Sequence, residues 1–283
     1  MANPAPPHLI KPAADRGLNM AVYEGGDWSR PQVMGIINAT PDSFHAASRE
    51  GDVERALEMF ENGADWVDIG GESTRPGAKL ISIEEEIARV IPLVKEISKS
   101  GKVSIDTRHS AVARLALDAG ASMINDVSGL RDSSMLDLVI EAQCYVCIMH
   151  MLGEPGNMQN NPQYDDVSLE VNGMLISKAR ELVERGHSMD KIFLDPGIGF
   201  GKSLEHNIEL LNSNSQLRPY SIMWGVSRKS MIGQICNQPD TEHRLAGSLA
   251  IAAKAFYEGI DLIRVHDVRE HTDLFATLEA LEG

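Results

Sequence analysis

A short apolar run that ends in a polar residue recurs eight times along this chain, and a segment with helical periodicity follows. Runs of this length, apolar almost throughout, are typical of strands that are buried on both faces of a parallel sheet. Strands that alternate regularly with helices indicate an α/β fold. The eight expected strands are Val33–Asn38, Trp66–Glu72, Lys102–Thr107, Ser122–Val127, Tyr145–His150, Lys191–Gly197, Tyr220–Ser227 and Asp261–Asp267.

The segments between these runs carry helix signals. Ser82 and Glu85 have the spacing of a capping box, which predicts a helix beginning there, with a kink at Pro92. Gly63 and Gly120 stand where the C-terminal caps of two other helices belong. The apolar positions expected on the buried helix faces are Val53, Ala56, Leu57 and Phe60; Ile83, Ile87, Val90, Val94 and Ile97; Val112, Leu115 and Ala119; and Leu245, Leu249 and Ala252.

Eight strands and their helices fit either an open doubly wound sheet or a closed (β/α)8 barrel. The count of eight favours the barrel, and so does the length of 283 residues, because such barrels need about 250 residues. We therefore predict an α/β fold, a (β/α)8 TIM barrel over residues 31–283. Residues 1–30 do not fit the repeat, and their glycines suggest a short N-terminal hairpin or lid.

Composition excludes several classes of protein. The chain has 26 Lys and Arg against 41 Asp and Glu, a net charge of −15, which argues against binding nucleic acid or an anionic membrane. Three cysteines do not make a disulfide framework. No apolar run approaches the length of a membrane span or of a signal-peptide core. We expect a soluble, cytoplasmic protein with no nucleic-acid or membrane partner.

A polar side chain stands at or just beyond the end of every expected strand. In a (β/α)8 barrel all strand C-termini open on one face, so these residues converge at one mouth. The acceptors among them suit a ring with several N–H donors, whereas the cations form a basic rim suited to phosphate or diphosphate. The pattern predicts a pocket for a heterocycle with a phosphorylated arm. The residues are Asn38, Asp68, Glu72, Asp106, Asn125, His150, Asp195, Lys229, Arg264 and His266, with Arg75 nearby.

Three local patterns have simpler interpretations. PGIGFGKS ends like a P-loop, but Pro196 occupies the position of its first glycine, so we expect no nucleotide there. Cys144 and Cys147 lie three residues apart, directly before and within an expected strand, and extended backbone points such residues to opposite faces, which favours buried hydrophobic side chains over a zinc site. Lys229 has two functional interpretations: a Schiff-base amine, or a charged donor to a carbonyl or phosphate.

Seven segments together resemble dihydropteroate synthase. They are MGIINATPDSF, DIGGESTRPGA, SIDT, INDVSG, DPGIGFGK, SRKS and LIRVHDV, and they run in the family's order from Val33 to Val268. The resemblance implies a (β/α)8 barrel, usually a homodimer. It also implies an enzyme that joins 6-hydroxymethyl-7,8-dihydropterin diphosphate to p-aminobenzoate with Mg²⁺, making 7,8-dihydropteroate and pyrophosphate. These substrates match the pocket expected from the strand ends.

The resemblance also assigns roles to individual residues. It implies that the pterin is held by Asp106, Asn125, Asp195, Lys229 and Arg264, and that the diphosphate is held by Asn38, Arg75, Arg264 and His266. Asn38 would also bind Mg²⁺. The aminobenzoate site would comprise Phe44, Thr74, Pro76, Phe200 and Ser230. Catalysis would rest on Asp106, Lys229, Arg264 and His266, by a dissociative route.

The chain departs from the family pattern in the first loop. The family commonly continues TPDSF with Ser-Asp-Gly-Gly, whereas HAASREG follows Phe44 here. This change leaves the pterin residues untouched and bears on aminobenzoate affinity and sulfonamide sensitivity. Three alternatives stay open: a pterin-dependent methyltransferase, a Schiff-base aldolase acting through Lys229, and a catalytically weak paralogue that binds pterin for regulation.

Overall fold

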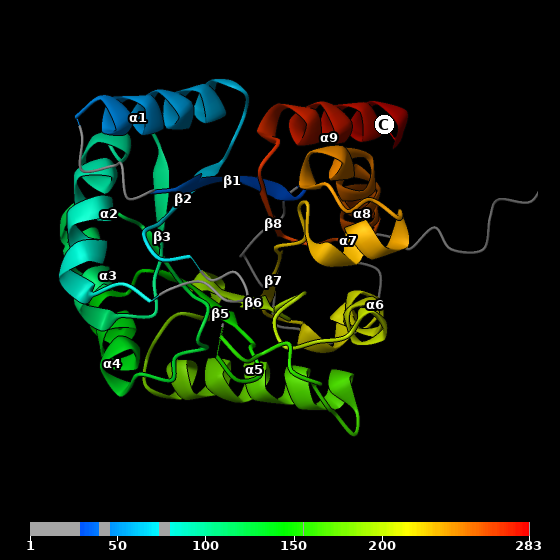
Figure 1. Ribbon diagram of the computed structural model, residues 1–283. Coiled ribbons are helices and arrows are strands. Elements are labelled where there is room, and N and C mark those ends of the chain that lie inside the picture. Colours follow the sequence, from blue (N-terminus) through cyan, green and yellow to red (C-terminus); the bar gives the residue numbers. More distant parts are fainter. Residues whose placement is uncertain (1–28, 40–45, 74–79, 155, 283) are drawn as a thin grey trace, which may run out of the picture.

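The computed structural model describes residues 29–39, 46–73, 80–154 and 156–282. Eight parallel strands form a closed barrel in which each strand pairs with the next along the chain and β8 pairs with β1 (Figure 1). The strands are β1 (Gln32–Asn38), β2 (Trp66–Gly70), β3 (Lys102–Asp106), β4 (Met123–Asp126), β5 (Tyr145–Met149), β6 (Ile192–Asp195), β7 (Ser221–Trp224) and β8 (Leu262–Val265). The predicted TIM barrel is confirmed. Several strands are shorter than predicted because their terminal polar residues belong to the loops.

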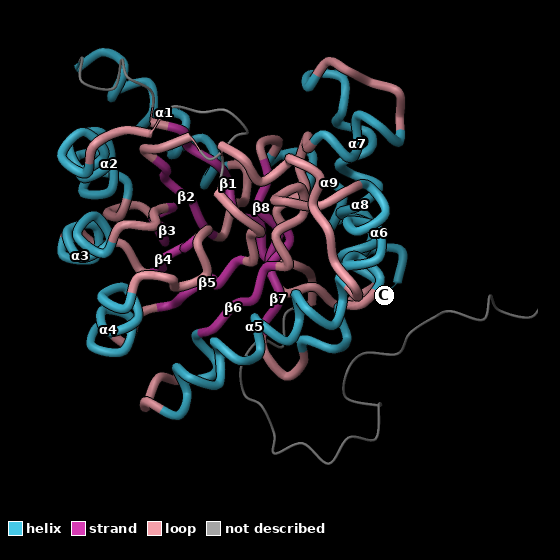
Figure 2. The backbone as a smooth tube through the Cα atoms, turned by 60° about the horizontal axis from the view of Figure 1, so that its bottom comes forward, coloured by secondary structure: helices cyan, strands magenta, loops and turns pink. Residues whose placement is uncertain are grey.

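Helices surround the barrel, with the strands at the centre (Figure 2). They are α1 (Ala46–Glu61), α2 (Ile83–Ile97), α3 (Ser110–Asp118), α4 (Ser133–Ala142), α5 (Val167–Glu184), α6 (Leu204–Asn212), α7 (Ser230–Ile235), α8 (Leu245–Tyr257) and α9 (Val268–Glu282). Short 3-10 turns precede β6, β7 and α8, namely Met189–Lys191, Asn214–Leu217 and Thr241–Arg244. No helix in the described part of the chain is long and apolar enough to cross a membrane.

The predicted helix signals act as expected at three positions. Ser82 caps α2 by accepting a hydrogen bond from the Glu85 backbone N–H, and the helix continues through Pro92 to Ile97. Gly63 and Gly120 have φ angles of +91° and +113°, which favour glycine just after a helix.

Part of the predicted apolar face is wrong. Leu57, Ile83 and Leu115 are 36%, 36% and 41% exposed. Each lies at the edge of its helix's apolar stripe. Only the centre of that stripe faces the barrel, as fully buried Ala56, Val90 and Val112 do.

The strands divide the core into two layers. Outward-facing residues such as Val67, Ile124 and Ile263 pack against the helices in one large cluster. Inward-facing residues form a second cluster inside the barrel: Met34, Trp66, Met123, Cys147, Phe193, Met223 and Leu262. Because side chains two residues apart on a strand face the same side, the next inward layer toward the strand C-termini comprises Asp68, Asn125, Asp195 and Arg264. A packed apolar plug therefore supports a polar layer at the mouth.

The predicted N-terminal hairpin over residues 1–30 lies outside the described residues, except for its last two. There Arg30 donates to Asp65 at 2.9 Å and joins the entrance of β1 to that of β2.

Candidate active site

Arg264 is the centre of a buried ion network at the barrel mouth. Its Nε donates to Asp68 Oδ2 at 2.6 Å, and its Nη2 donates to Asp106 Oδ2 at 2.9 Å. The Asn125 amide donates to the same Asp68 oxygen at 3.1 Å. Four strands thereby contribute one cluster, with the register Asp106 opposite Asn125 placing two of its members side by side.

Two buried acceptors in this cluster have no partner. Asp68 Oδ1 and Asn125 Oδ1 accept no hydrogen bond from any described residue, although both atoms are buried. A buried acceptor without a donor costs about 1–3 kcal/mol, so such atoms indicate where a ligand's N–H groups bind. The floor therefore suits a donor-rich ring, as the sequence predicted.

Burial makes Asp106 a weaker acid than an ordinary aspartate. Desolvation raises its pKa to about 7, against the lowering effect of the Arg264 guanidinium, and the neighbouring carboxylate of Asp68 raises it further. The group consequently changes charge near neutral pH.

Asp195 and Lys229 form the other side of the mouth. Asp195 is 3% exposed, and its Oδ1 accepts the Gly197 backbone N–H at 2.7 Å. The Lys229 ammonium donates to the Ile198 carbonyl at 2.5 Å and lies 4.4 Å from the centre of the Phe200 ring. Burial lowers the pKa of Lys229 to about 8, against the raising effect of Asp195. Lys229 is thus still largely protonated at neutral pH, which favours the charged-donor interpretation over the Schiff base.

A second ion pair holds the loops after β7 and β8 together. Arg228 has a φ of +56° and pairs with both Asp267 and Glu242. Ser227 Oγ accepts the His266 backbone N–H at 3.2 Å and lies 3.1 Å from its Nδ1. These contacts fix the chain immediately before Lys229 and just after Arg264.

Comparisons with known proteins agree with this geometry. The family described as Pterin binding enzyme matches residues 34–266. The chain belongs to this family. The dihydropteroate synthase of Escherichia coli strain K12 is 44% identical over 262 residues, or 90% of this chain and 93% of that protein.

Solved structures give the same result. A Yersinia pestis dihydropteroate synthase in complex with a sulfonamide drug superimposes with a TM-score of 0.83 at 41% identity, covering 90% of this chain and 95% of that one. A Burkholderia cenocepacia dihydropteroate synthase complexed with 7,8-dihydropteroate gives 0.82 at 42% identity, covering 89% and 92%. The resemblance found in the sequence is confirmed.

The described residues include most of the site predicted for this pterin-binding enzyme. Asp106, Asn125, Asp195, Lys229 and Arg264 converge at the mouth as predicted, with His266 beside Ser227. Asn38 ends β1 with an exposed side chain, and Ser230 begins α7. Four predicted residues lie outside the described residues: Phe44, Thr74, Arg75 and Pro76.

The donor set at the mouth bears on the expected magnesium ion. Where the chain is described, no group of three or more His, Cys, Asp or Glu side chains could hold a metal. Asn38 offers one neutral oxygen at the end of β1. This set does not fit a cage built from protein alone, but it fits Mg²⁺ bound mainly by water and substrate phosphates.

Sequence reasoning missed two roles. The sequence indicates only that Asp68 is a polar residue at a strand end, yet it accepts hydrogen bonds from both Arg264 and Asn125. Its position two residues after Trp66 places it in the inward layer, and this spacing is the signal for its role in the site. Lys202 is the lysine of the rejected P-loop pattern PGIGFGKS, and the pattern assigns it no role; in the structure it is 3% exposed and its Nζ lies 3.0 Å from His150 Nδ1.

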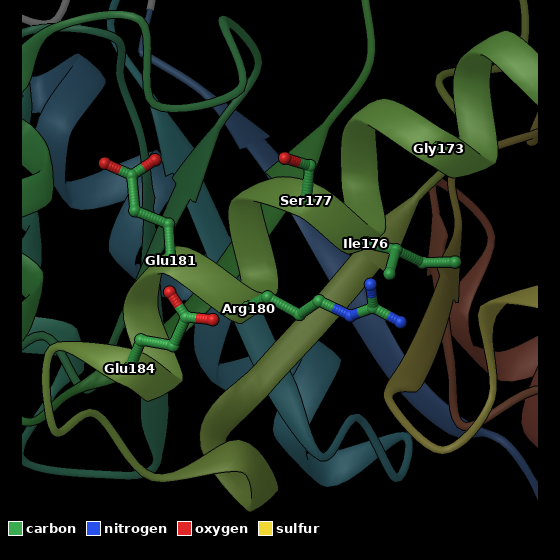
Figure 3. Close-up of a pocket in the computed structure, with 6 residues that line it drawn as sticks. All are labelled: Gly173, Ile176, Ser177, Arg180, Glu181 and Glu184. Atoms are coloured by element: carbon green, nitrogen blue, oxygen red, sulfur yellow. The ribbon is translucent and has the colours of Figure 1, made fainter.

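Two other features stand apart from the site. Cys147 belongs to the barrel interior while Cys144 packs against the outer cluster, so the two thiols lie on opposite sides of the sheet; Cys147 is buried as predicted, whereas Cys144 is only partly buried. A surface hollow on the outer side of α5 contains none of the predicted site residues (Figure 3). It is lined by Gly173, Ile176, Ser177, Arg180, Glu181 and Glu184.

Proposed function

We propose that this chain is a dihydropteroate synthase, a transferase of folate biosynthesis. It joins 6-hydroxymethyl-7,8-dihydropterin diphosphate to p-aminobenzoate and releases pyrophosphate. The observation that carries the proposal is the buried acceptor floor beside Arg264 and Lys229, in a chain 44% identical to a dihydropteroate synthase. Family resemblance and local chemistry thus favour the same substrates.

The pterin ring is the donor-rich heterocycle. Its ring N–H and amino groups face the unpartnered side-chain oxygen of Asn125 and the carboxylates of Asp106 and Asp195. Lys229 donates to an acceptor of the ring, and the Arg264 guanidinium lies against its face. Three carboxylates against two cations leave this region acceptor-rich, which favours a neutral ring with several donors.

The diphosphate arm extends from the pterin toward the rim. Arg264, His266 and Arg75 are its partners, and Asn38 would hold the Mg²⁺ that accompanies it. When bound, Mg²⁺ neutralises the charge of the departing pyrophosphate. Asn38 is exposed at the strand end, so a hydrated ion can reach it.

The reaction needs no protein nucleophile. The bond between the exocyclic methylene and the diphosphate oxygen breaks with its electron pair on oxygen, leaving a cation delocalised into the pterin. The Asp106 carboxylate stabilises that charge as it develops. The amine of p-aminobenzoate then forms the C–N bond and loses one proton. The poor nucleophile and the stabilised cation favour this dissociative order.

The aminobenzoate binds at the outer edge of the mouth. Phe200 supplies an aromatic face there and Lys229 a charge, with Ser230 at the start of α7. Phe44, Thr74 and Pro76 complete this site. Sulfonamides compete for it, in keeping with the drug complex of the Yersinia pestis relative. We also propose that the enzyme is a cytoplasmic homodimer.

The proposal is tested by following pyrophosphate and 7,8-dihydropteroate in one reaction of the purified chain with both substrates and Mg²⁺. We expect the two products in equal amounts. Without p-aminobenzoate, we expect at most one pyrophosphate released per active site. Pyrophosphate without dihydropteroate would contradict the condensation. Neither product, with pterin diphosphate tightly bound, would favour the regulatory paralogue. Methyl transfer from methyltetrahydrofolate would identify the methyltransferase, and borohydride trapping on Lys229 the aldolase.

A further inference from the structure

Lys202 is a buried ammonium surrounded by three acceptors. Its Nζ lies 3.0 Å from His150 Nδ1, 3.2 Å from the His150 carbonyl and 3.0 Å from the Phe200 carbonyl. A lysine ammonium has three N–H donors and no acceptor, so all three donors are used. The arrangement joins the end of β5 to the loop that follows β6.

Burial disfavours the charged forms of both Lys202 and His150. Burial lowers the pKa of Lys202 to about 7; Asp195 raises it, whereas the nearby Lys229 lowers it. Burial likewise lowers the pKa of His150 to about 3, so its ring is neutral and Nδ1 is free to accept. A buried lysine retained at this cost indicates a requirement for the contacts that it makes.

Four consecutive backbone carbonyls of the loop after β6 each accept a hydrogen bond from a side chain. The Lys229 ammonium donates to the Ile198 carbonyl, and the Lys202 ammonium donates to the Phe200 carbonyl. The side-chain amide of Gln159 donates to the Gly199 carbonyl, and the Tyr164 hydroxyl donates to the Gly201 carbonyl at 2.8 Å. Only glycine fits at position 197 in this loop, since a Cβ there would lie 1.9 Å from the His150 carbonyl oxygen, at a φ of +68°.

This loop carries the aromatic face at the mouth. The Phe200 ring is partly exposed and lies over the Lys229 ammonium at 4.4 Å. Of the four carbonyl contacts, the one from Lys202 acts directly on the Phe200 backbone. Removing it releases the residue whose ring faces the second substrate.

We propose that Lys202 is a positioning residue for the aminobenzoate half of the reaction: it holds Phe200 in place against the aromatic substrate and takes no part in binding pterin. The inference rests on the proposed function. Asp195, the last residue of β6, is held independently by the strand and by the Gly197 N–H at 2.7 Å. The hydrogen bond that positions Asp195 is therefore kept when Lys202 is removed, and Asp195 loses only an electrostatic contact that ranks below those of Lys229 and the Gly197 N–H.

The test compares Lys202→Met with Lys191→Met. Lys191 lies at the opposite end of β6 and also donates to a backbone carbonyl, that of Gln143 at 2.7 Å. The loss of a charge-assisted hydrogen bond from Lys202 should raise the KM for p-aminobenzoate by about tenfold. The kcat and the KM for pterin diphosphate should stay within about twofold, and Lys191→Met should match the wild type in all three.

Amide hydrogen exchange gives a readout that does not depend on activity. Exchange over residues 197–202 should accelerate in Lys202→Met and not in Lys191→Met. A folded Lys202→Met with unchanged aminobenzoate KM, or with both KM values raised alike, would overturn the proposal. A wild type that makes no dihydropteroate would overturn the proposed function instead, while the exchange comparison still decides whether Lys202 holds the loop. If Lys202→Met does not fold, Lys202→Gln carries the same comparison, because it keeps two donors without the charge.

Discussion

Replacement of Asp68 by Asn tests whether the Arg264 network is essential to the reaction. Asp68 is fully buried and touches Arg264 and Asn125 through a single oxygen. The Asn side chain has nearly the same shape, so the packing above Trp66 is kept. Two properties change: the charge-assisted bond to Arg264 is weakened, and one negative charge leaves the neighbourhood of Asp106.

Both changes have a predictable size or direction. A hydrogen bond to a charged group contributes about 1.5–3 kcal/mol, and about 1.4 kcal/mol corresponds to tenfold in rate. If Arg264 must be held to act on the pterin and its diphosphate, kcat/KM should fall by about 10- to 100-fold. The Asp68 carboxylate also raises the pKa of Asp106, so its removal should lower that pKa.

The assay is pyrophosphate release followed across a pH series, with Asp126→Asn as the matched control. Asp126 is another buried carboxylate that raises the pKa of Asp106, but its oxygens accept backbone N–H groups of Ser128 and Leu130. Asp68→Asn should lose activity at every pH and shift the acid limb to lower pH, whereas Asp126→Asn should shift the acid limb in the same direction and keep its kcat/KM on the pH plateau. A folded Asp68→Asn within twofold of wild type at every pH would refute the role of this network.

Four further predictions concern Asp106, Lys229, the magnesium ion and the cysteines. Asp106→Asn should lower kcat by about 100-fold with an unchanged thermal midpoint; normal turnover would rule out charge stabilisation by this carboxylate. The kcat/KM should rise with pH through about 7, as Asp106 ionises, and fall above about 8, as Lys229 loses its proton; a flat profile would contradict both assignments. Chelation should abolish turnover and added Mg²⁺ restore it, whereas full activity in excess chelator would exclude the ion. Thiol titration of the folded protein should label exposed Cys236 quickly but not Cys147, whose pKa burial raises, and rapid labelling of Cys147 would argue against the buried interpretation.

The barrel could be predicted because each strand carries its own signal. Parallel strands buried on both faces must be apolar along their length, and their polar ends mark where they leave the barrel. The edge of each helix's buried stripe was less predictable. Ile83 and Leu115 fit the helical period but lie outside the contact with the barrel, because periodicity gives a direction and not the width of the interface.

Convergence of the site could also be predicted, since all strand C-termini of a barrel meet at one face. The pairing of particular carboxylates with particular cations could not be predicted, because the pair of Arg264 and Asp68 joins residues 196 positions apart. Lys202 was hidden for a different reason: its partners are two backbone carbonyls and a ring nitrogen, and backbone acceptors leave no pattern in a sequence.

A structure of the chain with pterin diphosphate bound is the most direct test of the account. We predict the pterin ring on the floor above Trp66 and Met123, with its N–H groups donating to Asn125 and Asp195. Arg264 should lie against the ring, and the diphosphate should extend toward His266 and Asn38. A pterin bound away from Asn125 and Asp195, or a diphosphate seated in the loop Gly197–Lys202 instead, would contradict the central claim.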